Sequence, residues 1–139
     1  MHAFIGLLLN AFLMGVMTSF IVVTSPTVFK TLDEEHSKKF LRFIFPRLFN
    51  FCFLISTCMF LFFALAEFSF GMVAGIFIAI GFLINTYLLT PRINKMRDLM
   101  TRGHTGSEKK FKGLHFASVF LYLISMVFLV AILVLHYSR

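Results

Sequence analysis

Polar side chains are rare within the apolar segments of this chain, so those present are its candidates for chemistry. His115 is the most versatile of them, because an imidazole can bind a metal or carry a proton near neutral pH. Ser118, Tyr122 and Ser125 follow it at helical spacing. Residues three, seven and ten positions apart share one face of a helix, so we expect a polar stripe that faces the protein interior.

The other polar residues lie toward the same end of their predicted helices. At a rise of about 1.5 Å per residue, Asn85 is roughly 8 Å from the end of its helix. Two interpretations stay open. In the default interpretation these groups form interhelical hydrogen bonds, each worth about 0.5–2 kcal/mol. In the other, they line a small pocket open to the cytoplasm. The candidate pocket residues are His115, Asn85, Asn50, Arg92, Arg47 and Ser118.

Motifs of enzymes and cofactor sites are absent from the sequence. There is no glycine-rich phosphate loop, no H-E-x-x-H and no C-x-x-C. Cys52 and Cys58 lie in an apolar run and do not share a helix face, so we interpret them as small apolar residues. We therefore predict no catalytic residue, no metal site and no cofactor, and a non-enzymatic role is the default.

Composition indicates whether the folded chain is surrounded by water or by lipid. Hydrophobic residues make up 59% of the chain and charged residues 14%, with a mean hydropathy of +0.91. Soluble domains are about 45–50% apolar and about 25% charged. We predict a single all-α transmembrane domain, an integral membrane four-helix bundle with up-down-up-down topology. Its spans are expected at about 2–24, 43–66, 71–90 and 113–136.

Local signals predict where these helices begin and end. Ser25-Pro26 is expected to end or kink the first helix. Thr31-Leu32-Asp33-Glu34 resembles a capping box and predicts a helix start. Pro46 predicts a bend in the second helix. After Pro91, apolar residues recur at helical spacing, which predicts either a short amphipathic cytoplasmic helix on the membrane surface or an extension of the third span.

Basic residues decide the expected orientation. Five lie in and beside the first long loop and seven in the last, so one side holds twelve of thirteen and the other only Arg139. By the positive-inside rule both termini are extracytoplasmic, in a cell inner (cytoplasmic) membrane. The expected partners are the bilayer and anionic lipids of its cytoplasmic leaflet, because the cations occupy short loops rather than a nucleic-acid face.

A small-residue groove runs along the third span. Gly71, Gly75 and Ala79 recur every four residues and allow close helix approach. Packing within one bundle is the expected use, and a homo-oligomeric contact is the alternative.

Three segments together resemble the transmembrane-protein-205-like family, a membrane domain of unknown function. They are the 26–32 run PTVFKTL, Phe45-Pro46, and Pro91-Arg92 with the 111–118 run FKGLHFAS. The resemblance implies a four-helix membrane protein and no settled mechanism. The family pattern falls on Gly15, Phe29, Leu32, Phe45, Pro46, Pro91, Arg92, His115 and Ser118.

The chain also departs from that pattern. Gly6 stands where relatives often carry a histidine, the aromatic after Phe-Pro is displaced to Phe49, and Tyr122 replaces an asparagine. A looser likeness to the copper-resistance protein D and J-type protoporphyrinogen oxidase families, which handle metal or haem with membrane histidines, is weakened by the missing first-helix histidine.

Three functions compete at this point. The first is a structural or accessory membrane protein, which is the default. The second is a binding or transport protein for a small ligand, metal or tetrapyrrole, centred on His115. The third is a small haem-handling oxidoreductase.

Overall fold

The computed structural model describes residues 1–138 and is helical apart from short turns; Arg139, the basic residue expected on the far side, lies outside them. In this part of the chain four helical spans are long and apolar enough to cross a membrane: His2–Thr31, Glu34–Leu65, Ser69–Thr101 and Ser107–Tyr137. The all-helical class and the four spans are therefore confirmed. All four spans are longer than the predicted apolar cores: the first and third end later, and the second and fourth start earlier.

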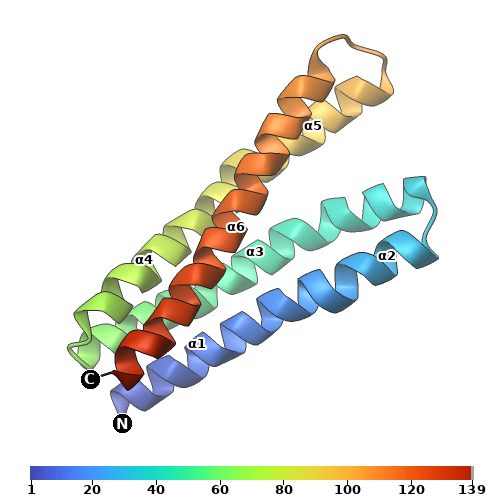
Figure 1. The fold of residues 1–139 in the computed structure, drawn as a ribbon. Coiled ribbons are helices and arrows are strands. Elements are labelled where there is room, and N and C mark those ends of the chain that lie inside the picture. Colours follow the sequence, from blue (N-terminus) through green and yellow to red (C-terminus); the bar gives the residue numbers. More distant parts are fainter. Residues whose placement is uncertain (139) are drawn as a thin grey trace.

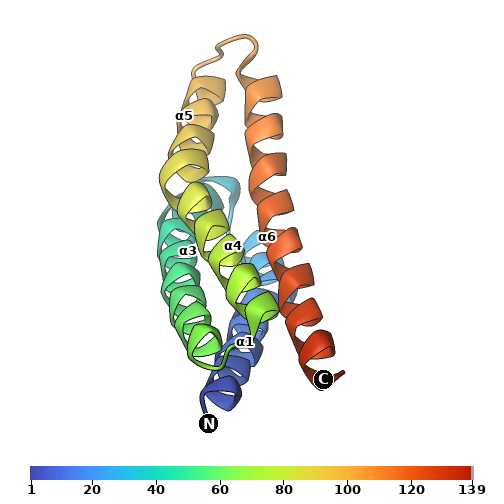
Figure 2. The same ribbon diagram turned by 90° about the vertical axis from the view of Figure 1, so that its left-hand side faces the viewer.

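The helices have two distinct ends, shown in Figure 1. The start of α1 (His2–Ser19), the end of α6 (Ser107–Tyr137) and the turn between α3 (Glu34–Leu65) and α4 (Ser69–Ile84) lie together at what we name the termini end (Figure 1 and Figure 2). The turn after α2 (Ser25–Thr31) and the loop after α5 (Thr90–Thr101) lie at the opposite, loop end. There the α2–α3 pair and the α5–α6 pair diverge as two arms.

Two π-helical turns carry the first and third spans past their prolines. They are η1 (Phe20–Thr24) and η2 (Asn85–Leu89), each followed by Ser-Pro or Thr-Pro. A proline lacks the N–H that an α-helix needs and its ring crowds the carbonyl four residues back. In the π turns the Ser25 N–H donates to the Phe20 carbonyl and the Thr90 N–H to the Asn85 carbonyl, five residues back. This register shift keeps the chain helical.

The prolines therefore do not end helices, which corrects the boundary expected at Ser25-Pro26. The stretch after Pro91 forms α5, which continues the third span through η2, so the extension is what the structure contains. Where α5 lies relative to the membrane surface stays a prediction.

The second span begins with an aspartate cap. The Asp33 carboxylate accepts the His36 backbone N–H at 2.8 Å, and α3 starts at Glu34. This bond and the His36 side chain hold the pKa of Asp33 below its usual range. Thr31, expected to be the capping residue, instead donates its hydroxyl to the Thr27 carbonyl within α2. The capping signal was therefore right about the region and wrong by two residues.

Close packing joins three spans at the termini end. The Phe63 ring lies between Gly6 of α1 and Gly71 of α4, where an added Cβ would meet it at 2.6 and 2.8 Å. At Gly75 a Cβ would approach the Phe60 backbone and Cβ at 3.1 Å. Without a hydrophobic driving force between helices, such glycine contacts are a main source of association in lipid.

The small-residue groove thus packs against α3 within the chain. Gly71, Gly75 and Ala79 are all buried there. The homo-oligomeric contact expected at these residues remains a prediction, and little of the groove is exposed to support it.

Large apolar side chains cover the outside of the bundle. Leu54, Phe77 and Val127 lie in the middle of three spans and are 61%, 59% and 64% exposed. A soluble monomer rarely exposes contiguous apolar surface of this extent. The exposed band and the span lengths together show a multi-pass membrane protein.

Filling the glycine contact tests this packing. In Gly75→Leu the new side chain has to displace Phe60 backbone, so we expect a loss of about 1–3 kcal/mol in unfolding free energy and a lower Tm in detergent. Gly15→Leu is the matched control, because a Cβ there meets nothing within 4 Å. Equal Tm values for the two variants would contradict the packing described.

Candidate functional site

The two arms enclose a cleft at the loop end, which we name the arm cleft. Its volume is about 1040 Å³, and its walls come from η1, α2, α3, α5 and α6. Most of its lining is apolar, and its charged residues Glu34, Lys38 and Arg97 lie toward the loop end. The apolar lining includes Phe20, Ile21, Phe29, Leu32, Leu41, Phe45, Phe49, Ile93, Met100, Val119 and Leu123.

A layer of hydrogen bonds and rings closes the floor of the arm cleft. The Tyr122 hydroxyl donates to the Met17 carbonyl at 2.9 Å, which joins α6 to α1. The Tyr122 ring lies 6.3 Å from that of Phe49 on α3. Behind this layer, the Asn85 amide donates to the Ser118 carbonyl at 3.4 Å. The floor therefore ties α6 to three other spans and separates the cleft from the tightly packed termini end.

A stack of three side chains forms the mouth on the α5–α6 arm. The Phe111 and His115 rings are parallel within 3° with centroids 5.8 Å apart. The Arg97 guanidinium lies over the Phe111 ring, 5.4 Å from its centroid. All three side chains line the cleft. The stack holds a cation and an imidazole at the edge of an apolar cavity.

Ion pairs set the charge balance around the cleft. Arg42 of α3 pairs with Asp98 of α5, so a charged contact joins the two arms. On the opposite rim Lys38 pairs with Glu34. Among residues 1–138 Arg97 has no ion-pair partner within 4 Å. The net charge that the cleft offers a ligand is therefore positive.

The structure brings together only part of the candidate pocket predicted from sequence. His115 and Ser118 line the arm cleft, and Asn85 lies buried directly behind Ser118. Arg92 lies outside it, on another face of α5. Asn50 is half-buried and does not line the cleft.

Arg47 likewise lies away from the cleft. Its guanidinium donates to the Phe43 carbonyl at 3.0 Å and lies over the Phe43 ring on the outside of α3. The polar stripe on the last helix does face inward, since Ser118, Tyr122 and Ser125 are buried, whereas His115 is exposed to the cleft.

Sequence reasoning missed Arg97 and the apolar wall opposite it. Arg97 was counted as one of twelve loop cations, and nothing in its spacing separated it from its neighbours. The available signal was that the helix could continue past Pro91. If residues 90–101 extend the third span, then Ile93, Arg97 and Met100 lie on one face of that helix.

Motif residues from three separate segments converge on the arm cleft. Phe29 of α2, Phe45 of α3 and His115 of α6 all line it, together with Leu32 and Ser118. The two departures Phe49 and Tyr122 line its floor and touch each other. These positions are far apart in sequence, so their meeting in one cavity is a property of the fold.

A family match covers most of the helices that form the arm cleft. The model of a domain of unknown function, DUF4149, matches residues 8–102, more than half of the chain. The chain belongs to the DUF4149 family. The match runs from α1 to the end of α5 and so covers most walls of the arm cleft in this DUF4149 protein. Searches of curated proteins and of solved structures gave no significant match.

Potential metal ligands are scattered in the described part of the chain. Within residues 1–138 no three His, Cys, Asp or Glu side chains lie close enough to hold a metal ion. On the first helix, the Phe63 ring occupies the space beside Gly6. A side chain at position 6 would therefore clash with Phe63.

Removing one hydroxyl tests the cleft floor. In Tyr122→Phe the bond to the Met17 carbonyl is lost, and we expect about 0.5–2 kcal/mol lower stability and a lower Tm in detergent. Tyr87→Phe is the control, because Tyr87 is 65% exposed. A Tm unchanged in Tyr122→Phe would show that this bond does not join α1 and α6.

Proposed function

We propose that this DUF4149 protein binds an anionic amphipathic small molecule in the arm cleft. The observation that carries the proposal is an apolar cavity of about 1040 Å³ with Arg97 and the adjacent His115 at its rim, Arg97 having no ion-pair partner within 4 Å among residues 1–138. Ligand pockets of folded proteins are about 300–1,000 Å³, mostly apolar, with a few polar groups that fix orientation. The arm cleft has this size and this distribution.

The chemistry of the walls selects the ligand class. The phenyl and aliphatic groups favour a hydrocarbon or aromatic body, and the Arg97 guanidinium favours a carboxylate or phosphate, which it can bind through two N–H groups. Fatty acids and carboxylate-bearing tetrapyrroles both belong to this class. His115 would donate or accept a hydrogen bond beside the same anionic group.

The convergence of motif residues supports the proposal. Phe29, Phe45 and His115 are among the positions that carry the resemblance to the transmembrane-protein-205-like family, and they meet in the arm cleft. Packing alone does not require this, because the glycine contacts that join the spans lie at the other end. We therefore propose that members of that more specific group share the same cleft.

The orientation that we propose opens the arm cleft to the cytoplasm. The loop end of the two arms carries Lys30, Lys38, Lys39, Arg102, Lys109 and Lys112 among other cations. Cytoplasmic loops of membrane proteins carry such an excess. The termini end would then face the extracytoplasmic side of an inner (cytoplasmic) membrane, and the proposed ligand would enter from the cytoplasm or the adjoining leaflet.

A structural or accessory role is the rival, with a partner helix in place of a ligand. The two differ in what the stack at the mouth does. A ligand site requires the charge of Arg97 and the ring of His115, whereas helix packing depends mainly on the apolar walls.

Binding of a defined probe separates these roles. We expect purified protein to bind oleate and protoporphyrin IX. Native mass spectrometry measures the binding of both ligands, and porphyrin fluorescence also measures that of protoporphyrin IX. Loss of the rim charge in Arg97→Gln, and of the ring in His115→Ala, should weaken binding about tenfold each, since a charge-assisted hydrogen bond is worth about 1.5–3 kcal/mol.

The matched controls are Arg102→Gln and His104→Ala, because both residues lie in the exposed loop and neither lines the cleft. Binding that is equal in all four variants, or absent from the unaltered protein, would contradict the ligand site.

Side-specific labelling tests the orientation. With Cys52 and Cys58 replaced by alanine, a cysteine at Glu67 should react with a membrane-impermeant maleimide in intact cells, and one at His104 only after lysis. Both positions are exposed, at opposite ends of the molecule. The reverse pattern would invert the proposed topology and place the arm cleft outside the cytoplasm.

A further inference from the structure

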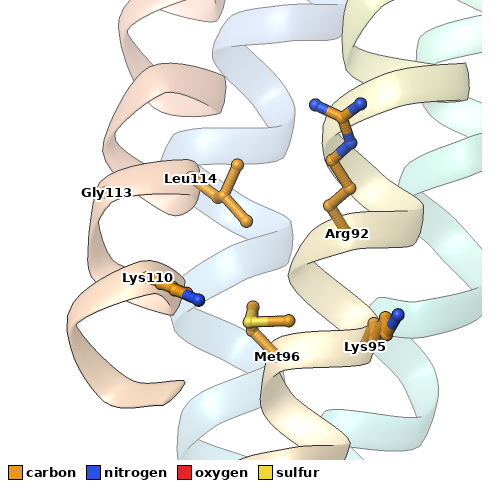
Figure 3. A pocket seen from close by; sticks show the side chains of 6 residues that line it. All are labelled: Arg92, Lys95, Met96, Lys110, Gly113 and Leu114. Atoms are coloured by element: carbon orange, nitrogen blue, oxygen red, sulfur yellow. The ribbon is translucent and has the colours of Figure 1, made fainter. Parts of the chain in front are cut away.

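A second cavity lies on the other side of the α5–α6 arm. It has a volume of about 490 Å³ and is lined by residues that do not line the arm cleft. Figure 3 shows Arg92, Lys95 and Met96 on α5 and Lys110, Gly113 and Leu114 on α6. We name this site the basic groove. The α5–α6 arm thus has two faces, one toward the arm cleft and one away from it.

The basic groove combines an apolar floor with uncompensated positive charge. Met96 and Leu114 lie between the two helices, with Arg92 extending from α5 above them and Lys110 on the α6 side, whereas Lys95 points away from them on the other side of α5. None of Arg92, Lys95 and Lys110 forms an ion pair within residues 1–138. The nearby acids are committed elsewhere, because Asp98 pairs with Arg42 and Glu108 with Lys112.

The place of the groove in the fold favours a lipid. It lies at the loop end, where η2 of the third span passes into α5 and where α6 begins, so it is near the expected edge of the apolar layer. A phospholipid offers an anionic phosphate for Arg92 and Lys110 and hydrocarbon for Met96 and Leu114. A soluble anion would leave the apolar floor without a partner.

We propose that the basic groove binds the headgroup of an anionic phospholipid from the membrane that the protein spans. Arg92 and Lys110, from different helices, contact the phosphate together, and the acyl chains continue along α6 past Leu114. The bound lipid neutralises charges that otherwise repel across the α5–α6 pair. The site is independent of the arm cleft, so either proposal can fail without the other.

Lipid retention in detergent micelles tests the charge requirement. The full chain is mixed with dioleoyl-phosphatidylglycerol or dioleoyl-phosphatidylcholine, which share acyl chains, and bound lipid is counted by native mass spectrometry. We expect the anionic lipid to be retained preferentially. The double variant Arg92→Gln, Lys110→Gln should bind it more weakly by about fivefold per cation removed.

A control pair with the same change in net charge is Arg102→Gln, Lys109→Gln, because neither residue lines the basic groove. It should retain the lipid within about twofold of the unaltered protein, on the scale of exposed charges. Equal losses in the two double variants, or equal retention of the two lipids, would overturn the proposal. So would full displacement of the lipid by excess inorganic phosphate.

A neutral substitution provides a second test that does not depend on charge. A Cβ at Gly113 meets nothing within 4 Å, so Gly113→Leu fills the basic groove without displacing a neighbour. We expect this variant to keep its Tm and lose the bound lipid. Gly15→Leu, also in open space on α1, should keep the lipid. Lipid retained by Gly113→Leu would exclude the groove as the binding site.

Discussion

Contact between the Phe63 ring and two glycines is the interaction on which the rest of this structure depends. It brings α1, α3 and α4 together at one end, where Gly6 and Gly71 leave no room for side chains. Lipid offers helices no hydrophobic reason to associate, so close contacts of this kind have to hold the bundle. At the other end the arms diverge and enclose a cavity, with the Arg42–Asp98 ion pair as a contact between them.

The helices continue past two prolines, and the continued segments form walls of the arm cleft. In lipid every backbone carbonyl needs a partner from the same helix or its neighbours. The π turns before Pro26 and Pro91 supply those partners and let α2 and α5 continue beyond the apolar cores. The continued helices build the walls of the arm cleft and bring Arg97 to its rim. A π turn before a proline, present in two spans, therefore contributes to placing both proposed binding sites at the loop end.

Much of the fold was readable from the sequence, and less of the site. Hydropathy and charge predicted the four spans, and helical spacing predicted that Ser118, Tyr122 and Ser125 face inward. A helix end was one of two alternatives at Ser25-Pro26 and is wrong, and after Pro91 the sequence did not decide between a surface helix and an extension, because π turns depend on hydrogen bonds that composition does not reveal. Placing Arg47, Asn50 and Arg92 with His115 failed for another reason: similar depth in the membrane does not tell which side of a helix faces a cavity.

The most direct test of the arm cleft is to identify what occupies it in cells. A photoreactive benzoyl-phenylalanine at Phe29, which lines the cleft, is compared with one at Phe116, which is exposed and does not line it. After irradiation, mass spectrometry identifies the adducts. The account predicts an anionic amphiphile at position 29 and bulk phospholipid at position 116. The same bulk phospholipids at both positions would show that the arm cleft is only a lipid-filled gap between helices.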